Sequence, residues 1–531
     1  MIRLKRDFKS QNLRSDPLWS YLFCSLIKNN GIVVFLYSSG RCMIKIAIFV
    51  FTFMTAIDIT CLATIMPQVI SSLGDMHLYP LMSSAYLMAF FITAPIFGKV
   101  SDHFGCKKAS FVALVLFLVG SLFSGVAFSM QELVIFRFIQ GIGACGLVNI
   151  CSILIARLYT ESHERSFMQA ILSVVWALAS ILGPLIGASL AAHFSWRFVF
   201  LLNLPLGIIA WFILRAFEEK HSKVAESFDK KSILLFCVGT LLVFIFLAKA
   251  PLSGFGSWKI ACGISGIALL AFFVKRSLTS LSPVIPFHLL RDPQIACCVI
   301  FGIISGICIT TSYTLISLYI QGALRLSIAS AGSVIMACSI GWAAGSFFCS
   351  YLLRLFNLRS CFLLSSCVLA TGFSLLAMGE EKNTLAYFVI CNSILGFGLG
   401  SMVNMTIVGM QQAAETRFLG RATSFLSVMR SLGTSSGAAL AGLLQLFYFR
   451  TKLEALQEGG VASDVAAKLL LAPEKFLDAT SAQSMDPAQF SQACQLFAES
   501  IQEVFLLPVI LLVLSAPLAF LLVKPKKHAT A

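Results

Sequence analysis

Long apolar runs with very few charged residues recur along this 531-residue chain, and they limit its fold more than any other feature. A helix needs about 20 mostly apolar residues to cross about 30 Å of hydrocarbon. Continuous apolar runs, unlike the alternating pattern of barrel strands, indicate helices that satisfy their own backbone hydrogen bonds. Fourteen such windows are found, at residues 44–67, 80–98, 109–131, 133–156, 167–192, 198–214, 232–248, 260–274, 293–317, 326–353, 360–379, 383–414, 422–449 and 504–523.

Composition supports a membrane protein. Hydrophobic residues make up 58% of the chain and charged residues only 12%, whereas soluble domains average roughly 45–50% and about 25%. Disordered chains have low apolar content, collagen has a strict glycine period, and coiled coils have charged heptads. This chain shows none of these three patterns. The sequence therefore excludes a soluble globular enzyme and predicts an all-α polytopic membrane protein.

Basic residues in the connections set the orientation. With a cytoplasmic N-terminus, twenty Lys and Arg residues fall in inner loops and the tail, and only five in outer connections. Short loops rich in Lys and Arg stay on the cytoplasmic side. We expect both termini to be cytoplasmic, in a multi-pass protein of the cytoplasmic (inner) membrane. The formal net charge of +15 then needs no nucleic-acid partner.

Residues 1–42 carry seven basic and two acidic side chains and no apolar run long enough to span a membrane. A cleavable signal peptide is disfavoured because no suitable cleavage site follows an apolar core. Two interpretations remain open. The segment is a basic extension on the membrane surface, or the protein begins at Met43 and Met1 is a wrongly assigned start.

Cysteine and histidine give no sign of a metal or cofactor site. The 17 cysteines include no C-x-x-C motif, and most lie within apolar windows, where a free thiol behaves as a small hydrophobe. The seven histidines lie in loops or at window ends, which disfavours a membrane-embedded haem. We expect no metal and no cofactor.

A weak internal repeat appears when the sequence is shifted by 255 residues. The shift superposes Gly141 and Gly143 on Gly396 and Gly398, and it also aligns Asn149 with Asn404 and Gly187 with Gly442. It maps the fourth window onto the twelfth, so two six-helix units flank two extra helices. The predicted domains are an N-terminal bundle (43–217), two linker helices (218–276) and a C-terminal bundle (277–531) with a long outer loop (450–503).

Three charged residues lie deep inside the windows: Asp58, Arg137 and Arg430. Charges in a membrane are costly, which makes them functional candidates. Burial disfavours an ionised carboxylate and a nearby cation favours it, so Asp58 beside Arg137 could bind and release a proton as solvent access changes. The alternative is a static ion pair that only fixes helix packing.

The segment after the second window carries Gly98, Asp102, Gly105 and Lys107, followed by Lys108. We interpret it as a cytoplasmic gating loop in which Gly98 allows a tight exit from the helix. It resembles the signature loop of the major facilitator superfamily, although His103 and Cys106 stand where that family usually has basic residues.

Two further segments resemble motifs of the same superfamily. Arg137-Phe-Ile-Gln140-Gly141-Ile-Gly143 is similar to a motif tied in that family to proton transfer. Gly183-Pro184-Leu-Ile-Gly187 resembles its antiporter motif, with alanine at both outer glycine positions. Small residues allow close helix approach and proline loosens a helix, although any helix bundle can use glycines in this way.

Other stretches resemble the fourteen-span drug:proton antiporters of the EmrB/QacA type. They are Ile57-Asp58-Ile-Thr60 with Met66-Pro67, and Ser195-Trp196-Arg197 followed by Asn203-Leu-Pro205-Leu-Gly207. The resemblance covers roughly residues 44–523. It implies a fold of 6+2+6 helices, alternating access and proton exchange. It further implies that Asp58 is the protonation site, that Arg137 tunes it, and that Gly183, Pro184 and Gly187 shape a leak-tight interface.

Polar residues of the spans supply candidates for a central cavity, namely Gln140, Asn149 and Arg430, and packing is an equally open role for the first two. The outer loop 450–503 has eight acidic and four basic residues, and its composition suggests short amphipathic helices. It could cover the outer mouth or contact a periplasmic adaptor protein.

The function that these features favour is proton-coupled export of small amphipathic drugs or toxic compounds across the lipid bilayer. A dedicated metabolite exporter of the same fold, for a siderophore, lipid precursor or toxin, is the alternative. A channel needs no titratable switch, and a membrane enzyme needs clustered catalytic side chains that the sequence lacks. The Gly183-Pro184 motif favours exchange over uptake by symport.

Overall fold

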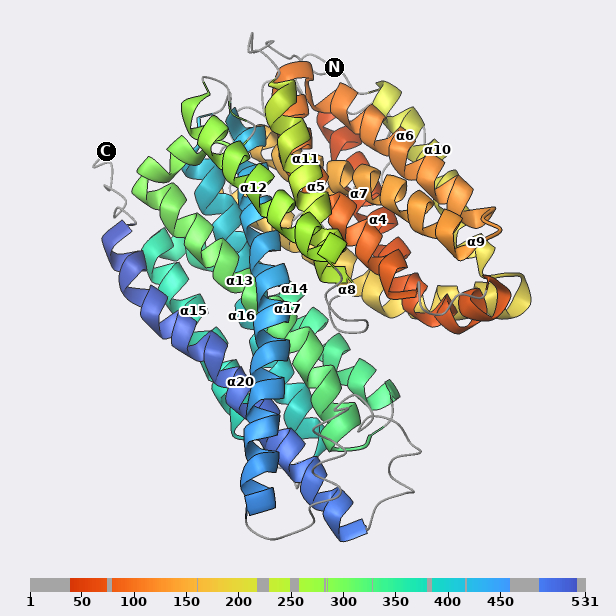
Figure 1. The fold of residues 1–531 in the computed structure, drawn as a ribbon. Helices are drawn as coiled ribbons and strands as arrows, with labels where there is room; N and C mark the ends of the chain where they lie inside the picture. The colour runs from red at the N-terminus through yellow and green to blue at the C-terminus, as the bar shows by residue number, and fades with distance from the viewer. Residues whose placement is uncertain are drawn as a thin grey trace, which may run out of the picture.

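The computed structural model describes residues 39–73, 79–159, 161–216, 229–248, 257–280, 283, 285–326, 328–379, 384–415, 418–458 and 487–522. All regular structure in these ranges is helical (Figure 1). The helices are α4 (Ser39–Leu73), α5 (Tyr79–Phe104), α6 (Cys106–Gly125), α7 (Met130–Leu158), α8 (Ser162–His193), α9 (Arg197–Leu201), α10 (Asn203–Ala216), α11 (Lys230–Ala248), α12 (Ser257–Thr279), η2 (Phe287–Arg291), α13 (Pro293–Leu318), η3 (Tyr319–Ala323), α14 (Ile328–Leu355), α15 (Leu358–Ala377), α16 (Leu385–Ala413), α17 (Leu419–Glu458) and α20 (Pro487–Leu522).

Within the described residues, thirteen helical segments have the length and hydropathy to cross a membrane. The expected window at 232–248 corresponds to α11, which packs against α12. The sixth crossing is built from α9 and α10, with Leu202 between them. Pro205 lies in the first turn of α10, where its missing N–H leaves no helical hydrogen bond unmade. The fourteen predicted windows therefore each match a helix or helix pair.

The helices form two groups, α4–α10 and α13–α20, and the α11–α12 pair lies beside them (Figure 1). The core divides in a similar way. Two clusters of buried apolar side chains lie within the first group, and a third fills the second group and extends to α5, α7 and the linker pair. The linker pair contacts the first group through Phe91 of α5 and Phe236 of α11, whose ring centroids are 5.9 Å apart. This arrangement is the predicted all-α fold of 6+2+6 helices.

The two groups repeat the same internal contacts, as the 255-residue shift predicts. Gly141 of α7 packs against the backbone of α5, and Gly396 of α16 packs against the backbone of α14. Two residues further on, Gly143 meets α6 and Gly398 meets α15. Glycine is required at all four positions because a Cβ would collide with the neighbouring helix. The thin sequence repeat is therefore a structural one.

Helix ends differ from the predicted limits mainly on the outer side. The outer loop was predicted at 450–503, but α17 continues to Glu458 and α20 already begins at Pro487. The remainder, 459–486, lies outside the described residues, as does most of the N-terminal extension. Helix α4 begins at Ser39, four residues before Met43.

Candidate transport site

A buried ion pair joins α4 and α7 in the first bundle. Arg137 Nη1 lies 2.7 Å from Asp58 Oδ2, and the two side chains are 1% and 0% exposed. The guanidinium also lies over the ring of Tyr86, 4.3 Å from its centroid. Charge-assisted hydrogen bonds and cation–π contacts are strong where water is excluded. The pairing expected from the sequence is present.

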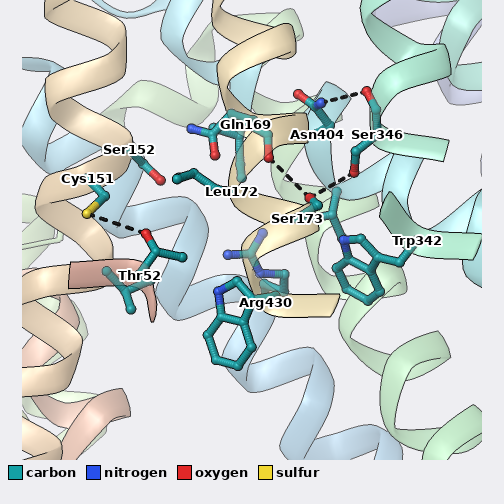
Figure 2. Close-up of a pocket in the computed structure, with 14 residues that line it drawn as sticks. Thr52, Cys151, Ser152, Gln169, Leu172, Ser173, Trp342, Ser346, Asn404 and Arg430 are labelled. Carbon is teal, nitrogen blue, oxygen red and sulfur yellow. Dashed lines mark hydrogen bonds between the residues drawn. The ribbon is translucent and has the colours of Figure 1, made fainter. Parts of the chain in front are cut away.

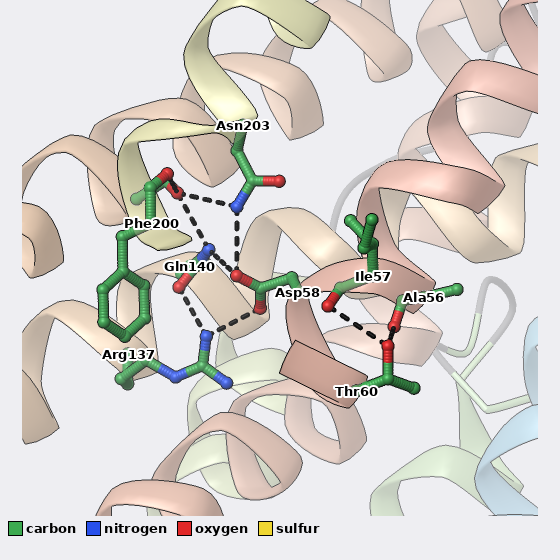
Figure 3. A network of polar contacts seen from close by, with 9 residues as sticks. Ala56, Ile57, Asp58, Thr60, Arg137, Gln140, Phe200 and Asn203 are labelled. Carbon is green, nitrogen blue, oxygen red and sulfur yellow. Dashed lines mark hydrogen bonds and ion pairs between the residues drawn. The ribbon is translucent and has the colours of Figure 1, made fainter. Parts of the chain in front are cut away.

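The second carboxylate oxygen of Asp58 accepts two amide hydrogen bonds (Figure 3). Gln140 Nε2 donates to Oδ1 over 2.8 Å, and Asn203 Nδ2 donates over 3.0 Å. Both amides also donate to Ser121 Oγ, which itself donates to the Phe200 carbonyl over 2.7 Å. We call Asp58, Arg137, Gln140, Asn203 and Ser121 the Asp58 network. Among the described residues, the hydrogen-bond donors to this carboxylate are side chains of the same bundle, on α7 and α10.

Sequence reasoning assigned no role to Asn203 or Ser121. Two signals could have pointed to Asn203. It belongs to a stretch that resembles the antiporters, and burying an amide at the edge of an apolar window costs free energy unless the amide has a hydrogen-bond partner. Ser121 gave no signal, because serines are common in membrane helices and form hydrogen bonds within their own helix.

Between the bundles lies a cavity of about 140 Å³, which we call the central cavity (Figure 2). Six helices contribute to its walls, three from each bundle: α4, α7 and α8, and α14, α16 and α17. Of the three predicted cavity candidates, only Arg430 lines it. Gln140 belongs to the Asp58 network instead, and Asn149 Oδ1 accepts a hydrogen bond from Ser427 Oγ of α17 over 2.9 Å.

Hydrogen bonds between the bundles lie in the helix halves that the basic residues assign to the cytoplasm. Asn404 Nδ2 donates to the Ser166 carbonyl over 2.9 Å, and Gln411 Nε2 donates to the Ser152 carbonyl over 3.1 Å. Asn149 and Asn404, which the repeat aligns, each bond across the interface. These contacts join the two bundles next to the central cavity, whose walls include Ser152 and Asn404.

Asp102, the acid of the predicted cytoplasmic gating segment, bridges the bundles. Its carboxylate accepts backbone hydrogen bonds from Gly420 and Arg421 at the start of α17, both over 2.9 Å. Arg157 of α7 lies 3.5 Å from the same carboxylate. An acid at a helix N-terminus satisfies otherwise unpaired N–H groups and favours the helix dipole. Asp102 therefore acts as a cap supplied by the opposite bundle.

The other residues of that segment lie differently from the prediction. The segment is not a loop, because α5 continues through Gly98 to Phe104. Gly98 serves close packing instead of a helix exit, since a Cβ there would lie 2.6 Å from the Gly420 carbonyl. The turn occurs at Gly105, whose φ of 91° favours glycine. Lys107 Nζ donates to the Arg215 carbonyl over 3.1 Å.

The predicted antiporter motif lies on α8, facing α4. A Cβ on Gly183 would lie 2.7 Å from Thr60 Cβ and collide with Thr60 Oγ1. Thr60 Oγ1 donates to the Ala179 carbonyl over 2.9 Å, which ties the helices together at this point. Helix α8 runs through Pro184 without interruption, and Gly187 is buried one turn beyond Gly183.

Two related helical bundles with a cavity between them and a buried ion pair in one bundle define a membrane transporter of the secondary type. The chain belongs to the Major Facilitator Superfamily, whose family model matches residues 48–438. It is a multi-pass membrane protein.

Among its relatives are named efflux proteins. The chain is 28% identical to "Multidrug resistance protein 3" of Bacillus subtilis (strain 168) over 484 residues, covering 90% of this chain and 94% of the relative. It is 27% identical to "Multidrug efflux pump SdrM" of Staphylococcus aureus (strain N315), covering 75% and 88%. It is 30% identical to "Uncharacterized transporter YebQ" of Escherichia coli (strain K12), covering 70% and 82%.

Solved structures show the same fold. The human organic anion transporter MFSD10 (TETRAN) aligns with a TM-score of 0.58 at 17% identity, covering 89% of this chain and 99% of that one. The proton:xylose symporter XylE aligns with a TM-score of 0.56 at 14% identity, covering 93% and 97%.

Proposed function

We propose that this protein exports small amphipathic compounds in exchange for protons. The relatives named for multidrug resistance and efflux support export. The Asp58 network supports proton coupling, and the cross-bundle hydrogen bonds support alternating access. The observation that carries the proposal is the Asp58–Arg137 pair, with both side chains 1% exposed or less.

The pair is confined to one bundle. Thr60 Oγ1 bonds the Ala179 carbonyl in the first bundle, and Thr310 Oγ1 bonds the Thr434 carbonyl in the second, each over 2.9 Å. Two residues before Thr310, where the first bundle has Asp58, the second has Cys308. The 255-residue shift aligns Arg137 with Asn392. An ion pair needed only for packing would serve both bundles equally, so its presence in one supports a functional role.

In the proposed cycle, water reaches Asp58 when the outer side is open. Protonation of the carboxylate removes the charge that holds Arg137 Nη1, and Gln140 and Asn203 lose their ionised acceptor. The helices α4 and α7 can then shift relative to one another, which changes the side from which the central cavity is open. Release of the proton to the cytoplasm restores the pair and resets the transporter.

Transport by the purified protein in proteoliposomes tests this function. The assay imposes a pH gradient and follows a panel of fluorescent amphipathic compounds of positive, zero and negative charge. We expect accumulation of at least one compound against its gradient, and we expect a protonophore to abolish it. Equal accumulation with the protonophore present would refute proton coupling, and movement of no compound would refute export of amphipathic compounds.

A further inference from the structure

The central cavity contains an uncompensated positive charge. Arg430 of α17 lines it, and its Nη1 is buried without a hydrogen-bond partner among the described residues. Of the fourteen residues that line the cavity, Arg430 is the only one whose side chain carries a charge. A buried guanidinium without a counter-charge is costly. The cavity therefore gains stability from any anion that enters it.

Figure 2 shows the guanidinium of Arg430 between Thr52 on one side and Trp342 on the other. Helix α17 is held in place at this point, because Gly306 of α13 packs against the Arg430 backbone. The backbone that carries Arg430 is therefore fixed by close helix packing, which places its side chain at the cavity wall.

Other groups of the cavity suit the same kind of ligand. Gln169 is 7% exposed, and its Nε2 is a second buried donor without a described partner. The cavity wall also includes Trp176 of α8 and Trp342 of α14. Indole faces bind flat apolar groups. One unpaired acceptor, Asn404 Oδ1, is available for a ligand hydroxyl or amide.

No acidic residue lines the central cavity, and the two buried acids of the described spans, Asp58 and Asp102, have partners elsewhere. Asp58 is paired with Arg137 and fully covered, and it does not line the cavity. Asp102 is bonded to the start of α17 at the cytoplasmic end. A cationic drug in the central cavity would face Arg430 with no carboxylate to hold it, and it would be repelled.

We infer that the substrates of this transporter are amphipathic anions, with an acid group on Arg430 and Gln169 and an aromatic or apolar body against the tryptophans. This inference rests on the proposed export function and narrows its substrate class. Carboxylates, sulfonates and sulfates share the required chemistry, because guanidinium binds planar or tetrahedral oxyanions through paired N–H donors.

Two probes of matched shape test the inference by titration calorimetry with purified protein in a neutral detergent. Each probe carries a naphthyl ring on the same alkyl chain, ending in a sulfonate in one and in a trimethylammonium in the other. We expect the wild type to bind the sulfonate about 10-fold to 100-fold more tightly, the range expected for hydrogen bonds to a charged group.

Variants test whether Arg430 causes the preference for the sulfonate probe. Arg430→Met keeps side-chain length without charge, and we expect it to erase the preference, whereas Arg430→Lys retains part of it. Arg354→Met, which removes an exposed arginine near the end of α14, is the matched control and leaves both affinities unchanged. Circular dichroism and elution as a single species show that each variant folds.

Three results would overturn the inference. They are equal affinity of the wild type for the two probes, tighter binding of the ammonium probe, and unchanged affinity of Arg430→Met for the sulfonate probe. Failure of both probes to bind would also overturn it. These results are separate from a failure of the proposed function, because the binding assay uses no gradient. A protein that accumulates cations against a pH gradient would still be a proton-coupled exporter, with a different substrate class.

Discussion

At Gly183 the contact between α8 and α4 leaves no room for a side chain. We expect Gly183→Ala to force the helices apart, because a new Cβ would collide with Thr60. Overpacking of this kind costs about 1–3 kcal/mol. The expected outcome is a lower apparent melting temperature of the purified protein and a several-fold slower transport rate.

The chain offers a matched control in Gly442 of α17. A Cβ there meets nothing within 4 Å, so Gly442→Ala should be neutral or slightly stabilising, because alanine favours helices over glycine. The 255-residue shift aligns Gly442 with Gly187, one turn after Gly183. If both alanine variants behave alike, the steric explanation for Gly183 is wrong.

The residues of the Asp58 network show what sequence reasoning can find. Asp58 and Arg137 were predicted because charges inside apolar windows are rare and costly. For Gln140 the sequence left a cavity role and a packing role open, and its hydrogen bonds go to Asp58 and Ser121. Only the packing of α7 against α4 and α6 determines which face of α7 meets which neighbour, and that packing cannot be read from one sequence.

At the scale of elements, the start of α17 depends on an acid from α5. Asp102→Ala removes the acceptor of the Gly420 and Arg421 N–H groups. Hydrogen bonds to charged groups contribute about 1.5–3 kcal/mol each, so we expect the cytoplasmic ends of the bundles to separate. Spin labels at Lys108 on α6 and Arg354 on α14 should report a longer distance in the variant.

Asp292 provides the control for this prediction. Its Oδ1 accepts backbone hydrogen bonds from Gln294 and Ile295 and caps its own helix, α13. Asp292→Ala should lower stability by about 1 kcal/mol, as loss of a helix cap does, without changing the distance between the labels. A longer distance in both variants, or in neither, would contradict the role of Asp102 as a link between bundles.

The linker helices carry a pH-dependent contact. Asp229, just before α11, accepts hydrogen bonds from Arg276 Nε and Nη2 of α12, both over 3.1 Å. Partial burial raises the pKa of Asp229, but the hydrogen bonds from Arg276 and Ser232 and the Arg276 charge outweigh this and lower it to about 2. Its ordinary pKa is 3.8.

A pKa lowered in the folded state stabilises the protein above the ordinary pKa, and this stabilisation is lost as the pH falls through the folded value. The apparent melting temperature of Asp229→Asn should therefore lie below that of the wild type by the same amount at pH 7 and pH 5. The difference should shrink only between about pH 3.8 and pH 2. Its disappearance already at pH 5 would exclude this ion pair as the cause.

Element positions were predictable to different degrees. Among the described residues, the windows located every helix long and apolar enough to cross a membrane, because about 20 apolar residues leave few alternatives to a membrane helix. The end of α5 was misplaced, because Gly98 reads as a helix stop, whereas the structure uses it for contact with α17. The limits of α17 and α20 were also misplaced, since hydropathy marks only the part of a helix inside the hydrocarbon.

At the scale of the whole molecule, two similar bundles carry different charges. The first holds the Asp58–Arg137 pair, and the second contributes Arg430 to the central cavity. The repeated glycine contacts keep the two halves geometrically alike. We propose that this asymmetry separates two tasks, with proton binding in the first bundle and substrate binding shared with the second.

Proton coupling through Asp58 is tested most directly by comparing two modes of transport in proteoliposomes that contain Asp58→Asn. We predict that the variant still exchanges labelled substrate for unlabelled substrate across the membrane, with no gradient imposed. We also predict that the variant loses accumulation driven by a pH gradient. Retained exchange shows that the variant folds and binds substrate. Gradient-driven accumulation equal to that of the wild type would contradict proton coupling through Asp58.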